Sequence, residues 1–164
     1  MHEEWFPLVN ETGETIGKAT RKECHSGSKQ LHPVIHLHVF NRAGDLYLQQ
    51  RSANKDIQPN KWDTAVGGHI DYGETVTDAL YREAREELNI INFTPSFVQQ
   101  YIFESEIERE LVYTFKTTCA GAIQPDKNEV KGGRFWTFEE IRSKMKRGIF
   151  TPNFEYEFLR IFPL

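Results

Sequence analysis

The stretch at residues 67–90 constrains the fold most, because it places a glycine pair directly before a strongly marked helix. After Gly67 and Gly68 the chain crosses a short polar loop and enters a helical pattern. Thr75 followed by Asp78 has the spacing of a capping box, and Asn89 suits a helix that ends in a left-handed residue. The sequence therefore predicts a helix between Thr75 and Asn89, with the glycines available for positive φ or close backbone approach.

Three carboxylates, Glu83, Glu86 and Glu87, lie on one face of this helix, since their spacings of three and four residues stay within a narrow arc. They are expected to face away from a buried apolar stripe formed by Val76, Leu80, Ala84 and Leu88. Neighbouring carboxylates repel, which raises their pKa values unless a cation lies among them. Their oxygens suit Mg²⁺ or Mn²⁺. The simpler alternative is a solvated face neutralised by Arg82 and Arg85.

The same stretch resembles the Nudix box, GX5EX7REUXEEXGU, across its loop and its helix. The matching residues are Gly68, Glu74, Arg82, Glu83, Glu86, Glu87 and Ile90, with Ala84 at the first apolar position. One departure is Asn89 in place of glycine, and asparagine is the next residue to tolerate that conformation. The resemblance implies an α/β Nudix fold, a mixed β-sheet sandwiched between α-helices, in a single domain over residues 1–164 with the box at 68–90.

The Nudix resemblance also implies Mg²⁺-dependent hydrolysis of a diphosphate linked to another group, with Mn²⁺ as the alternative metal. The metal ligands would be Glu83, Glu86 and Glu87 with the carbonyl of Gly67 or Gly68. Members of the family commonly take a water-activating carboxylate from a loop outside the box, which makes Glu129 a candidate general base. The alternatives for that role are Glu87 and Glu83 themselves.

The remaining chain alternates strands with a few helices. Residues 4–18 form two short strands around a turn at 10–13, and Thr20 caps a short helix through Cys24. Residues 33–40 and 46–51 form a hairpin, and further strands are expected at 99–103, 110–117 and 134–136. Helices are expected at 137–147 and from Thr151 onward, where Phe154, Phe158 and Ile161 would pack inward.

Composition narrows the class of protein. The chain of 164 residues, with 38% apolar and 13% aromatic residues, is long enough for one compact domain. Its net charge of −4 gives no general attraction to a nucleic acid polymer. Two cysteines make no disulfide framework, and neither a signal peptide nor a membrane span is recognisable. We therefore expect a cytoplasmic protein whose partner is a small-molecule diphosphate, with the oligomeric state open.

A second resemblance is to the type I isopentenyl diphosphate isomerases, a branch of the Nudix fold. The resemblance rests on His25, His32, His69, Glu108 and Glu110, which match five ligands of one metal in that family. It implies a second metal site here, for which Mn²⁺, Zn²⁺ or Fe²⁺ would serve as well as Mg²⁺. A strand would also project Glu108 and Glu110 to one side, since they are two residues apart.

The loop sequence QQRSANK resembles the diphosphate-binding segment of the isomerases, which supports Arg51 and Lys55 as substrate-binding residues. Lys61 is interpreted as an ordinary surface residue. His36 and His38 have no counterpart in the isomerase metal site, and are expected to be solvated or hydrogen-bonded.

The parts needed for isomerisation look absent. The isomerase cysteine, a proton donor, falls at Gly67, and its tryptophan falls at Asn153. The box glutamates are retained, which favours a hydrolase acting on a nucleoside diphosphate-linked or related substrate. Two alternatives are kept: an isopentenyl diphosphate isomerase, and a non-catalytic module that binds a nucleotide or diphosphate.

Overall fold

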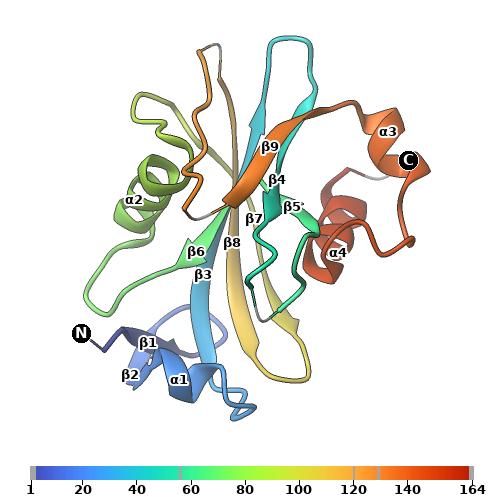
Figure 1. Ribbon diagram of the computed structural model, residues 1–164. Coiled ribbons are helices and arrows are strands. Elements are labelled where there is room, and N and C mark those ends of the chain that lie inside the picture. Colours follow the sequence, from blue (N-terminus) through green and yellow to red (C-terminus); the bar gives the residue numbers. More distant parts are fainter. Residues whose placement is uncertain (1–2, 56, 120, 129, 163–164) are drawn as a thin grey trace.

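The computed structural model describes residues 3–55, 57–119, 121–128 and 130–162, and shows helices on both sides of a mixed sheet (Figure 1). In chain order the elements are β1 (Trp5–Val9), β2 (Thr15–Thr20), α1 (Arg21–Cys24), β3 (Leu31–Phe40), β4 (Leu46–Arg51), β5 (Trp62–Thr64), β6 (Val66–His69), α2 (Val76–Leu88), β7 (Ser96–Glu104), β8 (Arg109–Thr118), β9 (Val130–Trp136), α3 (Phe138–Ser143) and α4 (Pro152–Ile161).

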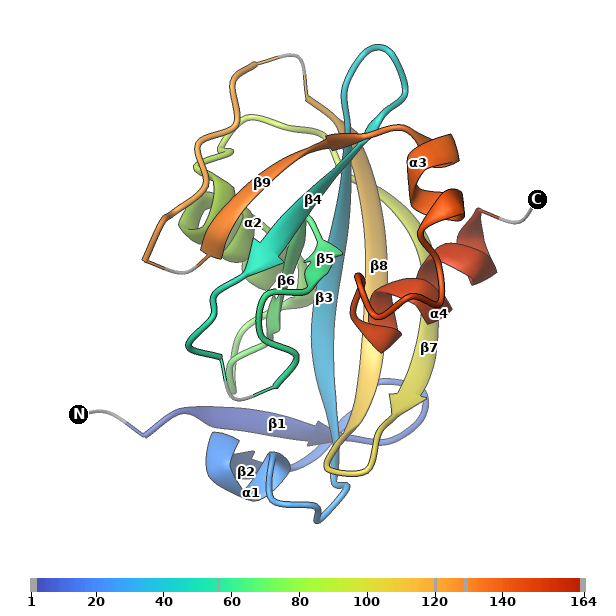
Figure 2. The same ribbon diagram turned by 45° about the vertical axis from the view of Figure 1, so that its right-hand side comes forward.

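Strand β3 is the centre of the main sheet. It runs parallel to β8 over its whole length, from Leu31 beside Arg109 to Phe40 beside Thr118, and antiparallel to β6 on the box side. The sheet order is β5-β4-β3-β8-β7, with β6 paired to β3 and β9 paired to β4. The small β1–β2 hairpin and α1 lie across one end of this sheet (Figure 2). One face of β3 packs against α2 and the other contacts Glu157 of α4, which explains its nearly continuous burial.

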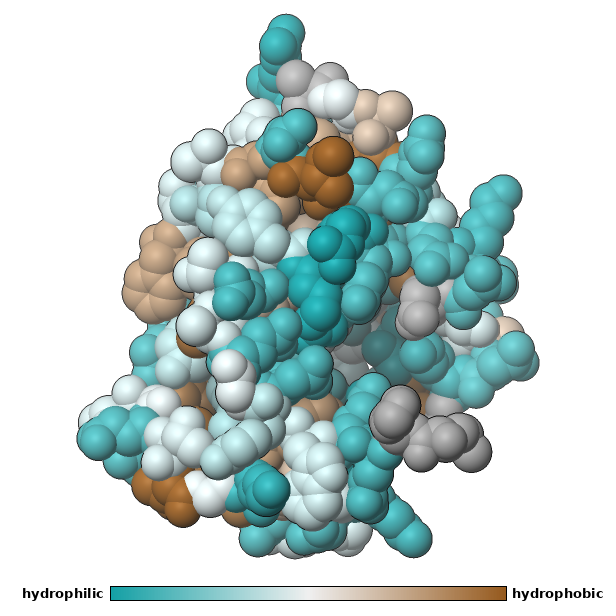
Figure 3. Space-filling view, turned by 90° about the vertical axis from the view of Figure 1, so that its left-hand side faces the viewer, coloured by the Kyte–Doolittle hydropathy of each residue, from teal (hydrophilic) through white to brown (hydrophobic). Residues whose placement is uncertain are grey.

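Two apolar clusters hold the layers together. The first joins alternate β3 residues to one stripe of α2, and contains Ile35, Leu37, Val39, Ala79, Leu80, Ala84 and Leu88. The second joins β4 and β9 to α3 and α4, and contains Leu46, Leu48, Trp136, Ile141, Phe150, Phe154 and Phe158. Figure 3 looks onto the side that carries α2, and shows it largely covered by hydrophilic side chains. No helix in the described ranges is both long and apolar enough to cross a membrane.

The box helix has the predicted ends. The Thr75 side chain accepts a hydrogen bond from the Asp78 N–H at 3.0 Å, and Asn89 takes the left-handed conformation with φ 57°. The short helix α1 is closed by a complete capping box between Thr20 and Glu23. The turn before β2 uses Gly13 at φ 95°. These features depend on neighbouring residues, so the sequence was sufficient to predict them.

Two predicted elements are corrected. The helix expected to reach residue 147 ends at Ser143, because the chain turns at Lys146, which has φ 59° and donates its N–H to Glu155 Oε2 at 2.6 Å. The hairpin between β3 and β4 is registered at a single pair, Phe40 with Leu46, because the strands diverge to take other partners.

Candidate active site

Two of the box carboxylates pack against the glycine strand β6. Gly68 lies so close to Glu83 that a Cβ at this position would be only 2.6 Å from Glu83 Oε1. Gly67 donates its backbone N–H to Glu87 Oε2 at 3.1 Å. Neither glycine is among the positive-φ residues, so Gly68 is required here for close approach rather than for a left-handed turn. Strand β6 therefore fixes where both carboxylates lie.

Arg82 holds the acidic cluster together. Its guanidinium contacts Glu74 at 2.7 Å, Glu83 at 2.8 Å and Glu86 at 3.3 Å, and donates a further hydrogen bond to the His69 carbonyl at 3.0 Å. One planar group thus connects the loop, the helix and the end of β6. Arg82 was predicted as part of the Nudix box, but its contacts with the loop and with β6 were not predicted from the sequence.

The environment of Glu83 and Glu87 opposes their ionisation. Desolvation by burial is the main cause that raises the pKa of Glu83 to about 7, against the opposing charge of Arg82. The pKa of Glu87 is raised well above its usual range, first by desolvation and then by the charge of Glu83. Glu86 is exposed, as expected, but Glu83 and Glu87 are half-buried rather than turned toward water. A divalent cation among these oxygens would relieve the repulsion, so this donor set fits Mg²⁺ or Mn²⁺.

Of the predicted substrate-binding residues, Arg51 ends β4 and Lys55 lies in the loop that follows it. Arg51 reaches Asp63 Oδ2 at 3.6 Å and donates to the Ile57 carbonyl at 3.1 Å, whereas Lys55 is exposed in a turn. Asp63 also raises the pKa of Glu87 by its charge, which brings Arg51 into the neighbourhood of the box. Glu129, the candidate base from a loop, lies outside the described residues.

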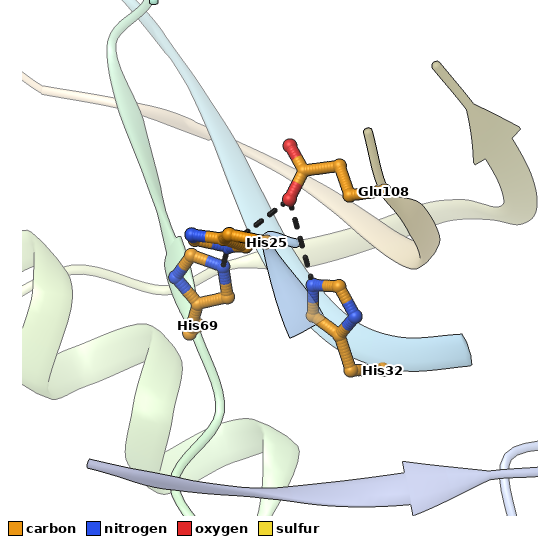
Figure 4. A group of neighbouring side chains, drawn as sticks. All are labelled: His25, His32, His69 and Glu108. Carbon is orange, nitrogen blue, oxygen red and sulfur yellow. Dashed lines mark hydrogen bonds and ion pairs between the residues drawn. The ribbon is translucent and has the colours of Figure 1, made fainter. Parts of the chain in front are cut away.

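A second cluster is formed by His25, His32, His69 and Glu108, whose ligand atoms all lie within 4.8 Å of one another. As Figure 4 shows, these side chains point toward a common centre. The Nε2 atom of His25 is 3.0 Å from Glu108 Oε2 and 3.1 Å from His69 Nε2, while His32 Nε2 is 3.7 Å from the same Glu108 oxygen. A group of three imidazoles and one carboxylate gathered in this way could hold a metal ion.

The cluster draws its members from four separate segments and is braced from outside. Helix α1 carries His25 at its C-cap, and β3 and β6 supply His32 and His69. His32 Nδ1 lies 2.9 Å from the Gln30 carbonyl, a contact that leaves Nε2 directed inward. The ring of Phe6 stacks on His69 with centroids 4.4 Å apart. These supports orient the imidazoles before any ligand binds.

The electrostatics of the cluster also suit a cation. Burial and the neighbouring His32 lower the pKa of His69 well below its usual range, so its ring is neutral and can offer a lone pair. Burial raises the pKa of Glu108, but its close contacts with the imidazoles of His25 at 3.0 Å and His32 at 3.7 Å outweigh this and the net shift is downward. The buried His32 Nε2 has no hydrogen-bond partner among the described residues. An unpaired nitrogen aimed at an ionised carboxylate fits a metal ligand.

Glu110, the fifth residue of the predicted set, lies outside this group of four. It stands on β8 in register with His32, and is buried. Glu108 precedes the strand, which begins at Arg109, so the two glutamates are not held by one regular strand as expected. Desolvation is the leading cause that raises the pKa of Glu110 to about 7, followed by the charge of Glu108.

His36 and His38 do not join the cluster. They are buried and hydrogen-bonded to Glu157 of α4, which agrees with the prediction that they are not ligands of that metal site. The sequence reasoning missed Glu157, although a signal existed: it occupies the inward stripe of its helix, three residues after Phe154.

Comparison with known proteins identifies the family. A family model described as the NUDIX domain matches residues 30–154. The chain belongs to the Nudix family. An uncharacterised Nudix hydrolase of Listeria monocytogenes is 34% identical over 154 residues, covering 93% of this chain and 90% of that protein. A Nudix hydrolase of Deinococcus radiodurans is 30% identical, covering 90% and 87%.

The similar proteins include an isomerase as well as hydrolases. An isopentenyl-diphosphate Delta-isomerase of Mycolicibacterium vanbaalenii is 28% identical, covering 86% of this chain and 81% of that protein. A crystal structure from Deinococcus radiodurans superimposes with a TM-score of 0.84 at 25% identity, covering 97% and 99%. The Nudix domain of Shewanella oneidensis NrtR, solved with ADP ribose, has a TM-score of 0.57 at 14% identity, covering 68% of this chain and 75% of that one, and shares the fold alone. The expected mixed α/β Nudix fold is confirmed.

Proposed function

We propose that this Nudix protein hydrolyses a diphosphate bond in a small molecule, such as a nucleoside diphosphate derivative, with the help of Mg²⁺ or Mn²⁺. The observation that carries the proposal is the placement of Glu83 and Glu87 against β6, where burial and mutual repulsion oppose their negative charge. Such an arrangement costs stability unless a cation binds there. Carboxylates held in this way are typical of a functional site.

Each residue has a role in the proposed reaction. Glu83, Glu86 and Glu87, with the carbonyl of Gly67 or Gly68, would hold the metal, which when bound offsets phosphate charge and lowers the pKa of a water. Arg51 and Lys55 would bind and orient the diphosphate. The base that takes the proton of the attacking water would be Glu87 or Glu83, with Glu129 as the alternative from the loop.

Replacement of Glu87 tests this proposal. Glu87→Gln should abolish Mg²⁺-dependent cleavage in a screen of diphosphate compounds resolved by mass, while the fold stays intact by circular dichroism. Glu139→Gln is the matched control, because Glu139 is an exposed carboxylate on α3. Near-normal cleavage by Glu87→Gln would remove the box from the mechanism. Tight binding of a nucleotide without product over hours would favour a non-catalytic binding module instead.

We also propose a second divalent cation at His25, His32, His69 and Glu108. The support is their convergence and the unpaired His32 Nε2. This same cluster favours the isomerase as a second candidate function, since the resemblance to isomerases assigns it their metal. Exchange of solvent deuterium into isopentenyl diphosphate would support the isomerase. Gly67 has no side chain to donate the proton, so we expect no exchange.

A further inference from the structure

A buried hydrogen-bond network lies on the face of the sheet opposite α2, and the proposed hydrolysis does not account for it. Its centre is Glu157 of α4, whose side chain is fully buried. The carboxylate accepts hydrogen bonds from Tyr101 Oη at 2.6 Å and Thr114 Oγ1 at 2.8 Å. It is also contacted by His36 Nδ1 at 2.9 Å and by His38 Nε2. Four polar partners on one carboxylate fix the orientation of both imidazole rings.

The two histidines differ in what lies on their free side. His38 is fully buried, and its ring packs against Phe162 in a T-shaped arrangement. Its Nδ1 has no hydrogen-bond partner among the described residues. His36 stands opposite Gly67 in the β3–β6 pairing. A Cβ on Gly67 would lie 3.4 Å from His36 Cδ2 and 3.8 Å from Nε2. Because glycine has no Cβ, the Cδ2–Nε2 edge of His36 borders a space that β6 leaves unfilled.

Gly67 connects this edge to the box. Gly67 stands opposite His36 in the sheet and also donates its N–H to Glu87, so one residue lies between the imidazole edge and a box carboxylate. Asp63, which pairs with Arg51, is near enough for its charge to act on both His36 and Glu87. A diphosphate bound between the box and Arg51 would therefore lie within reach of His36.

We infer that His36 contacts the substrate directly, through a hydrogen bond between its Nε2 atom and the diphosphate beside Gly67. Since a carboxylate can only accept, His36 Nδ1 is the donor toward Glu157, which leaves Nε2 as the ring nitrogen that faces the space beside Gly67. The arrangement of acid, imidazole and open Nε2 is one that orients a histidine for a ligand. The inference rests on the proposed function, since it names a further substrate-binding residue of the same site.

The alternative role is structural, in which the network only fastens α4 to the sheet. His36→Gln and His38→Gln separate the two roles, because both histidines contact Glu157 but only His36 borders the space at Gly67. A structural network predicts similar losses for both variants. Substrate contact predicts that kcat/KM falls roughly tenfold or more for His36→Gln, chiefly through KM, and less than about twofold for His38→Gln.

Binding without turnover gives an independent measurement. Protein labelled with ¹⁵N-histidine is titrated with imidodiphosphate, a non-hydrolysable diphosphate, in Mg²⁺. We expect the His36 Nε2 resonance to shift while that of His38 stays in place. Gly67→Ala, which places a methyl group in the space without touching Glu157, should weaken imidodiphosphate binding even if His36→Gln fails to fold.

The results distinguish the contact with His36 from the proposed hydrolysis. If Glu87→Gln is inactive but His36→Gln behaves as His38→Gln does, or if the His36 resonance does not respond, the substrate contact is wrong and the hydrolase proposal stands. If imidodiphosphate fails to bind the wild-type protein, the contact is overturned. If Glu87→Gln retains cleavage, the proposed function itself is wrong.

Discussion

Replacing Glu83 by Gln should make the metal-free protein more stable, although it removes a carboxylate that we place in the active site. The folded protein raises the pKa of Glu83 from its ordinary 4.5 to about 7, with desolvation as the main cause. The side chain is only 15% exposed, so solvent screening reduces this effect little. Gln keeps the shape of the side chain but has no charge to be desolvated. The substitution therefore removes a penalty that the folded state carries when Glu83 ionises.

The size and sign of this effect follow from the shift. Below pH 4.5 Glu83 is protonated in both states and carries no penalty. Between pH 4.5 and about 7 the unfolded chain ionises first, so the free energy of unfolding falls as the pH rises. One pKa unit corresponds to about 1.4 kcal/mol, so the full penalty above pH 7 is roughly 3 kcal/mol. For a chain of this length that is a Tm increase of roughly 6 to 12 °C for Glu83→Gln.

The assay is thermal unfolding in EDTA at pH 4.5 and pH 8, for the wild-type protein, Glu83→Gln and Glu86→Gln. Glu86 is the matched control because it lies on the same helix face with half of its side chain exposed. We expect a gain for Glu83→Gln at pH 8 only, and added Mg²⁺ should reduce the difference by stabilising the wild-type protein. A variant that is less stable than wild type at pH 8, or equally stabilised at pH 4.5, would refute the reasoning.

Two further substitutions test the two clusters. Gly68→Ala should raise the Mg²⁺ concentration for half-maximal activity by about tenfold or more, because the new methyl group displaces the Glu83 carboxylate. This concentration is measured by titrating the activity of each protein with Mg²⁺. An unchanged Mg²⁺ requirement would mean that Glu83 does not need its observed position. His32→Ala should lose the tightly bound metal of the second cluster when purified protein is measured by atomic absorption, and equal metal content in both proteins would exclude His32 as a ligand.

Local sequence signals predicted the parts of the site that depend on neighbouring residues. The caps at Thr75 and Asn89 and the spacing of Glu83, Glu86 and Glu87 are all set within one helix. The burial of these carboxylates is not set within the helix, because it depends on which strand packs against the helix. Strand β6 approaches closely enough to desolvate Glu83 and Glu87, while Glu86 stays in water. A helical projection could place the three acids together but could not distinguish them.

Long-range pairing limited the prediction elsewhere. The network around Glu157 joins His36 and His38 to a residue more than a hundred positions later in the chain. Only the parallel register of β3 and β8 aligns His36 with Thr114, and only the packing of α4 brings Glu157 above them. The four members of the histidine cluster could be named from the resemblance, but the role of Phe6 as a stacking partner could not.

The two adjacent glycines of β6 have different neighbours, because successive residues of a strand face opposite sides of the sheet. At Gly68 any side chain would collide with the Glu83 carboxyl group, so the box itself demands glycine. At Gly67 a Cβ would find ordinary contact distances to His36, so a small side chain fits there without moving the backbone. The resemblance to the isomerases places their cysteine at the position of Gly67. A side chain that donates a proton would fill this space, whereas Gly67 leaves it open, as the proposed contact between His36 and a diphosphate requires.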